Sequence, residues 1–202
     1  MADLEGKTEP GTGGVGETGG ASGPSPRKEE LLRRTLEYAA EHNLSDLSLR
    51  PLAKAIGSSP RVLLYLFGSK NGLIREVLAL NRAEQLALLD EALAGSATPR
   101  EALDRLWEWI TDPARHHLRR LFFEAYTRAL GDDATWDDFA ARSVNDWLPP
   151  LRRLVRNTRA DGEAEATLVL AVLRGLLLDL LASDDTERVT AAWQAFLDRF
   201  YP

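Results

Sequence analysis

The spacing of apolar residues from Ser25 onward constrains the fold more than any other feature, because nearly every segment repeats them at the period of an α-helix. In the first segment Leu32, Leu36 and Ala39 share one helix face, and Asn43 stands where that helix can end. No alternating strand pattern of useful length appears. The sequence therefore predicts an all-α protein.

Capping residues and prolines divide the later part of the chain into further helices. Thr98 and Glu101 have the spacing of a capping box, and Pro113 stands where a following helix begins. A later helix meets Pro149 and Pro150, which are expected to kink or divide it. The remaining predicted helices run over about 70–94, 162–182 and 185–200.

Residues 1–24 differ in composition from everything that follows. They hold 8 of the 15 glycines and almost no bulky apolar side chain, so burial cannot offset the entropy lost on ordering. We predict a disordered tail over 1–24. We also predict one structural unit over 25–75 and a second over 76–202, with an approximate boundary because no sharp break separates them.

The charges are unevenly distributed, although the whole chain carries −6. Residues 27–80 contain 9 basic and 6 acidic side chains, whereas residues 81–202 contain 15 and 21. Because phosphate repels an acidic surface, only the first of these segments suits nucleic acid. The sequence has no cysteine and no secretory signal pattern, so we expect a cytoplasmic protein without disulfides. We expect no membrane span, since Arg174 and Asp179 interrupt the longest apolar stretch.

Two short helices stand close together near the middle of the basic segment. Ser48 can cap the first of them and Gly57 ends it, while Pro60 opens the second and Gly68 stops it. Together with the longer helix before them, they match a helix-turn-helix, whose last helix enters the major groove of DNA. We place this DNA-binding unit within residues 25–75.

Leu63, Leu66 and Phe67 are expected to face inward. The helical period then turns Arg61, Leu64 and Tyr65 outward. An arginine can pair with a guanine edge or a phosphate, and a tyrosine can bind phosphate or contact a thymine methyl. The opening of the next helix, with Lys70, favours a phosphate. The predicted DNA-binding set is Ser48, Arg50, Ser59, Pro60, Arg61, Leu64, Tyr65 and Lys70.

The stretch 57–70, GSSPRVLLYLFGSK, resembles the signature of the TetR-type family of transcriptional repressors. The resemblance covers about residues 27–75 and rests on matches at Gly57, Ser59, Leu63, Phe67, Ser69 and Lys70. The chain departs from the pattern at Leu64, where the family usually has a phosphate-binding tyrosine, and at Leu66, where it usually has a histidine.

This resemblance implies a homodimer with about nine helices per subunit, which binds a palindromic operator and responds to an unknown small-molecule effector. The second unit would then bind the effector and form the dimer. For the effector pocket we expect contributions from Trp107, Phe122, Phe123, Tyr126 and Trp147. For the dimer interface we expect the apolar stripe Val189, Trp193, Phe196, Leu197 and Phe200 on the last helix.

Other functions remain as alternatives with less support. An enzyme is disfavoured because the chain has no cysteine, phosphate loop or nucleophile elbow, and we expect no cofactor. His116 and His117 are adjacent and cannot chelate one metal as an i, i+4 pair would, so we expect no metal and place both histidines on the surface, within the run 115–120. We expect Arg152, Arg153 and Arg156 to solvate the end of an apolar helix face or to pair with nearby acids, and we assign them no DNA role. A helical ligand-binding or scaffold dimer without specific DNA binding stays open.

Overall fold

A computed structural model of the protein describes residues 25–95, 98–131, 134–136, 138–155 and 162–201. The predicted tail 1–24 and Arg156 lie outside these residues. Within them the chain is all helical, which confirms the predicted fold class. The helices are α1 (Pro26–Glu41), α2 (Leu49–Ala55), α3 (Pro60–Phe67), α4 (Lys70–Ala94), α5 (Pro99–Thr111), η1 (Pro113–Arg115), α6 (His116–Ala129), η2 (Ala134–Trp136), α7 (Phe139–Asn145), α8 (Leu148–Val155), α9 (Gly162–Ser183) and α10 (Thr186–Phe200).

The N-terminal caps of the helices follow the sequence prediction closely. Ser25, Ser59 and Ser69 each accept a backbone N–H from the first turn of the helix that they precede. Both halves of the capping box between Thr98 and Glu101 are present at the start of α5. These bonds satisfy donors that a helix leaves without intrahelical partners, which explains why the helices begin where they do.

The helix that meets the two prolines is divided, as expected. It ends as α7 at Asn145 and resumes as α8 at Leu148, so that Pro149 and Pro150 fall in the first turn of α8, where a missing N–H costs nothing. Counted as one broken helix, the pair brings the α-helices of the described residues to nine.

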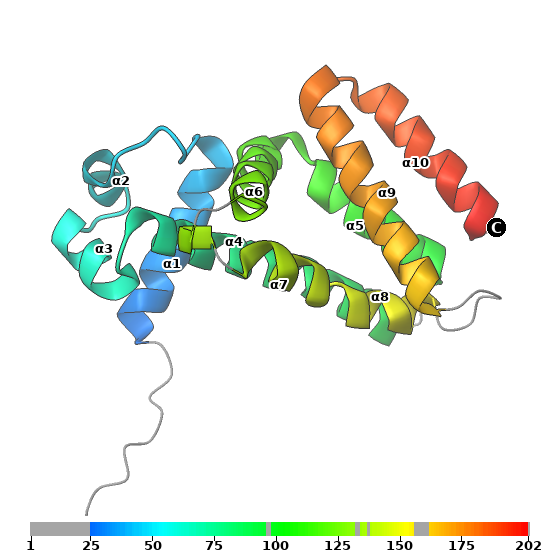
Figure 1. Cartoon of the computed structure of the whole chain (residues 1–202), viewed down its shortest axis with the longest axis horizontal. Helices are drawn as coiled ribbons and strands as arrows, with labels where there is room; N and C mark the ends of the chain where they lie inside the picture. The colour runs from blue at the N-terminus through cyan, green and yellow to red at the C-terminus, as the bar shows by residue number, and fades with distance from the viewer. Residues whose placement is uncertain (1–24, 96–97, 132–133, 137, 156–161, 202) are drawn as a thin grey trace, which may run out of the picture.

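The long helix α4 connects the two ends of the molecule. Figure 1 shows α1, α2 and α3 around its first half and α5, α8, α9 and α10 beyond, with α6 between the two groups. Buried apolar residues form two clusters that meet along α4. We call the first the N-terminal cluster; it is built from α1–α3, Leu73–Leu78 of α4, α6 and Phe139. We call the second the C-terminal cluster; it is built from Leu89 and Ala92 of α4 together with residues of α5, α8, α9 and α10.

The residues of α6 that join the N-terminal cluster are Leu118, Leu121 and Ala125. This helix belongs to the second predicted unit by sequence position, yet it helps to complete the core of the first. The boundary near residue 75 therefore stays a prediction.

Helix α9 is long and apolar enough to cross a membrane by length and composition, and it is the one such helix among the described residues. Its best 18-residue window has a mean hydropathy of 1.9. A core helix passes the same test, and α9 packs against α6, α8 and α10. Arg174 also lies at its middle, where it bonds to other helices. The inner face of α9 lies in the C-terminal cluster, which accounts for part of this composition.

Candidate nucleic-acid interface and ligand cavity

The turn between α2 and α3 depends on a glycine. Gly57 has a φ of 70°, in the left-handed region that side chains rarely adopt. A Cβ there would also meet Nη1 of Arg34 at 3.1 Å. After this turn, Oγ of Ser59 accepts the N–H of Val62 at 3.3 Å and starts α3. The two helices are thus set by local chemistry at the positions predicted.

Two arginines of α1 hold this turn in place. Arg34 donates to the carbonyl of Ile56 and Arg27 donates to that of Gly57, both at 3.2 Å. Glu30 forms ion pairs with both arginines, which orients them. The hydrogen bond from Arg27 is the main reason that the pKa of Glu30 is lowered. These contacts were not anticipated from the sequence, because pairing across 22 or more residues leaves no local signal.

Helix α3 presents its outer face to solvent. Tyr65 is 87% exposed and Leu64 is 45% exposed, whereas Leu63 and Phe67 are buried in the N-terminal cluster. Arg61 is also exposed. This orientation is the one that the helical period predicted, and contact with DNA stays a prediction.

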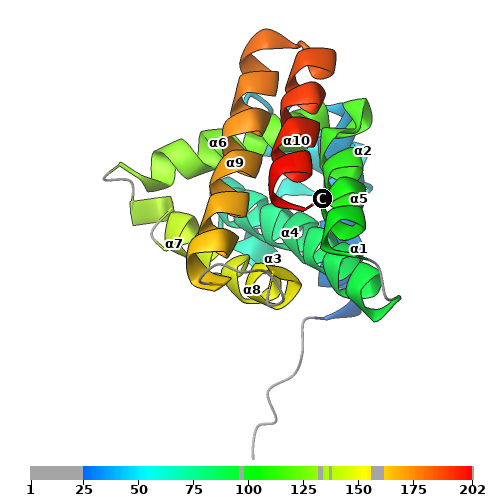
Figure 2. The ribbon, with the colours of Figure 1, turned by 90° about the vertical axis from the view of Figure 1, so that its right-hand side faces the viewer.

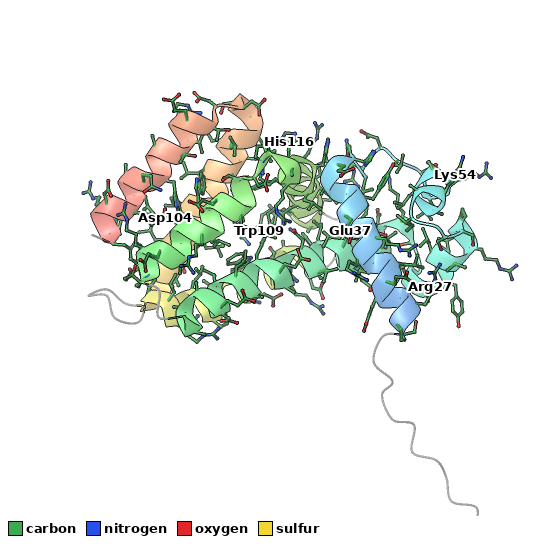
Figure 3. The ribbon with its side chains drawn as sticks, turned by 180° about the vertical axis from the view of Figure 1, so that it is seen from behind. Arg27, Glu37, Lys54, Asp104, Trp109 and His116 are labelled. Atoms are coloured by element: carbon green, nitrogen blue, oxygen red, sulfur yellow. The ribbon has the colours of Figure 1, made fainter. Side chains whose placement is uncertain are left out.

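The charged residues of α2 and α3 all have one sign. Between Leu49 and Phe67 the charged residues are Arg50, Lys54 and Arg61, and no acidic residue occurs there. Arg50 and Lys54 are exposed, and Figure 3 shows Lys54 on α2 at the end of the molecule remote from α10. Helices α2 and α3 thus contribute three cations and no carboxylate, which suits a phosphate backbone, while Glu37 and Glu41 of α1 line one surface pocket with Lys54.

The other predicted DNA contacts, Ser48, Ser59 and Pro60, differ in whether they offer a side-chain group to a ligand. Ser48 is exposed and its side chain makes no cap bond, so its hydroxyl is open to a ligand. Ser59 is exposed but already used as a cap, and Pro60 is half-buried in the first turn of α3. Both shape the start of α3 rather than offering a free donor.

Lys70 is engaged inside the protein. Its Nζ donates to the carbonyl of Ser45 at 2.7 Å, and burial is the main reason that its pKa is lowered. The hydroxyl of Ser45 in turn bonds to Glu124 of α6. Two further ammonium hydrogens remain for the predicted phosphate contact. The residue also connects α4 to the loop before α2.

A cavity lies between α4, α5, α6 and α9, with a volume of about 60 Å³. Of the aromatic residues predicted for a pocket, Phe122, Phe123 and Trp147 line it. Trp107 does not, because it is buried and stacked on Trp193 with ring centroids 5.0 Å apart. Tyr126 lies behind the wall, with its hydroxyl near a lining arginine. Trp109, labelled on α5 in Figure 3, lines the cavity and was not predicted.

Arginines form most of the polar part of the cavity wall, together with Asn81 and Gln85. Arg119 is only 8% exposed and donates to the carbonyls of Ile110 and Asp112, at 2.7 and 2.8 Å. Arg115 is half-buried, with its guanidinium carbon 3.5 Å from the ring centroid of Trp109. These residues close the bend between α5 and α6, where α5 ends with unpaired carbonyls that a buried cation can satisfy.

Arg174 approaches the same cavity from α9. It donates to the carbonyl of Ser143 at 2.7 Å and to the hydroxyl of Tyr126 at 3.4 Å, and its guanidinium lies over the ring of Phe122. Burial is the main reason that the pKa of this group is lowered, since desolvation disfavours its charged form. The fourth lining arginine, Arg82, forms an ion pair with Asp146 at 2.9 Å.

The stripe predicted to form a dimer interface is mostly internal. Val189, Trp193 and Leu197 are 0% exposed and belong to the C-terminal cluster, so they cannot contact a second chain while the protomer is folded. Phe196 is half-buried and Phe200 is exposed. The sequence alone does not distinguish an apolar stripe that packs in the protomer's own core from one that packs against a partner.

The outer face of α9 is an apolar surface that the protomer leaves uncovered. Leu168 and Leu178 are 39% and 53% exposed, and Ala171 and Gly175 between them are exposed as well. Figure 2 shows α9 and α10 side by side on the near side of the molecule. One helix face therefore carries exposed apolar residues over several turns.

The remaining predictions concern charged and titratable side chains. Arg152 pairs with Glu163 and Arg153 with Asp90, which confirms acid pairing for these two. His116 and His117 are half-buried rather than on the surface. In the part of the chain that the structure describes, no group of three or more His, Asp or Glu residues is placed to hold a metal ion.

Comparisons with known proteins point in one direction, although no protein-family model matches the chain. A curated relative, the HTH-type transcriptional regulator BetI of Ectopseudomonas mendocina (strain ymp), is 29% identical over 133 residues. The match covers 64% of this chain and 60% of the relative, so the chain spans less than two thirds of the length of that protein.

Solved structures match the fold over most of its length. A putative TetR-family transcriptional regulator from Rhodococcus sp. has a TM-score of 0.70 at 20% identity, over 87% of this chain and 98% of the other. A putative transcriptional regulator from Saccharomonospora viridis in complex with choline has a TM-score of 0.69 at 18% identity, over 85% and 95%. At these identities the likeness concerns the fold.

Proposed function

We propose that this chain is a TetR-type transcriptional regulator, which binds a palindromic DNA operator as a homodimer and releases it when a small molecule occupies the cavity. In this proposal residues 25–75 bind DNA, and residues 76–202 bind the effector and the second subunit. Family inference also supports a cytoplasmic location and repression as the usual sense of regulation.

The observation that carries the DNA-binding proposal is the outer face of α3. A tyrosine that is 87% exposed would gain more from a partner than from water, and it lies one turn from the exposed Arg61. Arg61 can read a guanine edge or bind phosphate, while Tyr65 can contact a phosphate or a thymine methyl. Leu64 adds an apolar contact. Ser48, Arg50 and the free hydrogens of Lys70 would then set the register on the backbone.

The exposed face of α9 supports the dimer. A second copy of the same face would cover Leu168, Ala171, Gly175 and Leu178, whose small members allow two helices to approach closely. Phe200 and Phe196 of α10 are the members of the predicted stripe that remain accessible to a partner. A twofold dimer built here would keep both copies of α3 free to enter successive major grooves.

The cavity supports regulation by a small molecule. The structural neighbour from S. viridis is in complex with choline, which supports a small-molecule effector for this chain. Helix α6 supplies Leu118 and Phe122 to the cavity wall and Leu121 to the N-terminal cluster. A ligand that moves α6 would therefore change the packing that supports the DNA-binding helices.

The test is selection of binding sites from random duplex DNA with the purified full chain. We expect an enriched palindrome, to which Arg61→Ala and Tyr65→Ala bind at least about tenfold more weakly, with Arg105→Ala on the exposed face of α5 as a charge-matched control. Failure to enrich any palindrome, together with equal binding to all duplexes, would contradict the proposal and favour a scaffold dimer.

A further inference from the structure

Three of the four arginines that line the cavity have no carboxylate partner. Arg115, Arg119 and Arg174 form no salt bridge within 4.0 Å to any residue of the described part of the chain, whereas Arg82 is neutralised by Asp146. No aspartate or glutamate stands among the described residues of the cavity wall. Asp112 is near enough to Arg115 and Arg119 to act on both at longer range, as are Glu84 and Asp184 on one each. The wall itself is cationic.

One of these arginines also keeps a donor unused. The side chain of Arg119 is held by two carbonyl groups, yet its Nε is buried and has no hydrogen-bond partner among the described residues. A buried donor without a partner is costly, so a ligand atom that accepts from it would be favoured. Burial lowers the pKa of Arg115, Arg119 and Arg174, which reflects the same cost of holding charge out of water.

The rest of the wall is apolar. Trp109, Phe122, Phe123 and Leu173 line the cavity beside the arginines, so a ligand there meets both apolar and charged groups. The volume of about 60 Å³ is well below the roughly 150 Å³ that hold a benzene ring in a protein core. The space fits a short aliphatic body. Asn81 adds a buried acceptor, Oδ1, without a partner among the described residues.

From this juxtaposition we propose that the effector is a small organic anion, a carboxylate on a short aliphatic body, held by Arg119 and Arg174 with Arg115 at the side. The inference rests on the proposed function only in calling this ligand an effector. Carboxylates match the planar donor fork of a guanidinium, and the low-polarity wall strengthens that pairing. A small cation would meet three unpaired positive charges at this wall and is excluded.

The experiment titrates the purified full chain, without DNA, with sodium acetate and sodium propionate by calorimetry and by tryptophan fluorescence, since Trp109 and Trp147 line the cavity. Acetamide and propionamide have the same shape without the charge, and choline chloride is the cationic control. We expect each carboxylate to bind saturably and at least about tenfold more tightly than its amide. Equal binding of carboxylate and amide, tighter binding of choline, or no binding of either carboxylate would overturn the proposal.

Variants assign the binding to the arginines. Arg174→Gln and Arg119→Gln each remove one charge-assisted contact and are expected to weaken carboxylate binding about 10- to 100-fold, with little change for the amides. Arg105→Gln, which changes the same charge on the exposed face of α5, should bind as the parent does. Because Arg119 also holds two carbonyls, Arg115→Gln serves as the variant least exposed to misfolding. Unchanged affinity in Arg174→Gln and Arg115→Gln would refute the assignment.

The two proposals fail separately. Carboxylate binding in a protein that selects no operator would refute the DNA-binding proposal and leave the ligand class standing. An operator complex that forms normally, in a protein that binds no carboxylate, would refute the ligand class alone.

Discussion

Helices α3 and α4 meet at Gly72, in the first turn of α4. A Cβ added there would lie 2.2 Å from the carbonyl oxygen of Phe67, the last residue of α3. The obstacle is backbone rather than a flexible side chain, so it cannot rotate away. Gly72→Ala therefore requires the end of α3 and the start of α4 to separate by roughly 1 Å before an ordinary contact distance is reached.

The cost can be set against the gain from helix propensity. Overpacking of this kind costs about 1–3 kcal/mol, and the rigidity of the backbone places Gly72→Ala near the upper end. Alanine inside a helix recovers up to about 1 kcal/mol relative to glycine. We expect a net loss of about 2 kcal/mol in the free energy of unfolding, equal to a fall in Tm of roughly 4–8 °C for a chain of this length.

Thermal unfolding and operator binding together measure the effect. The matched control is Gly95→Ala at the other end of α4, where φ is −77° and the added Cβ meets only ordinary contacts. Gly95→Ala should stay within about 0.5 kcal/mol of the parent. Gly72→Ala should also bind the selected operator more weakly at a temperature where it is fully folded, because α3 is displaced. Equal Tm values for the two variants would refute the reasoning.

Three further expectations concern the C-terminal helices. Trp193→Ala should cost about 3–5 kcal/mol in unfolding free energy, because it removes a fully buried ring, and denaturant unfolding measures this. Asp179 has its pKa lowered mainly by hydrogen bonds from Arg188, so the pair stabilises the fold above the ordinary aspartate pKa and loses this contribution as pH falls through the lowered value. Asp179→Asn should therefore show a shallower loss of stability below about pH 4 in unfolding curves taken across pH. Ala171→Glu on α9 should convert dimer to monomer in sedimentation, whereas Ala87→Glu on the exposed face of α4 should not; the same mass for both would contradict the proposed interface.

The helices themselves could be predicted from the sequence because their determinants are local. Ser59, Ser69 and Thr98 act as caps where their spacing predicted, and Pro149 and Pro150 mark the division between α7 and α8. The bend after Asp112 was expected as a helix start, and the structure inserts a turn of 3-10 helix there. The stops and starts depend on a few neighbouring residues, which a single sequence contains.

Contacts between distant segments could not be predicted from the sequence, because they leave no local signal in it. The inward face of α10 was assigned to a partner because an apolar stripe does not state which surface it covers, and Trp193 instead stacks on Trp107. Arg119 is buried, although arginine is usually exposed. Its burial depends on the carbonyl of Ile110 at the end of another helix, and nothing near Arg119 in the sequence signals that contact.

Helix α6 has one face in the cavity and another in the N-terminal cluster, and this arrangement has a thermodynamic consequence. If a carboxylate in the cavity lowers the affinity for the operator by some factor, the operator must lower the affinity for the carboxylate by the same factor. The coupling free energy between the cavity and the DNA-binding helices is thus a single quantity, which can be measured by titrating either ligand. Titrating the carboxylate with and without saturating operator gives that quantity without any assay of transcription.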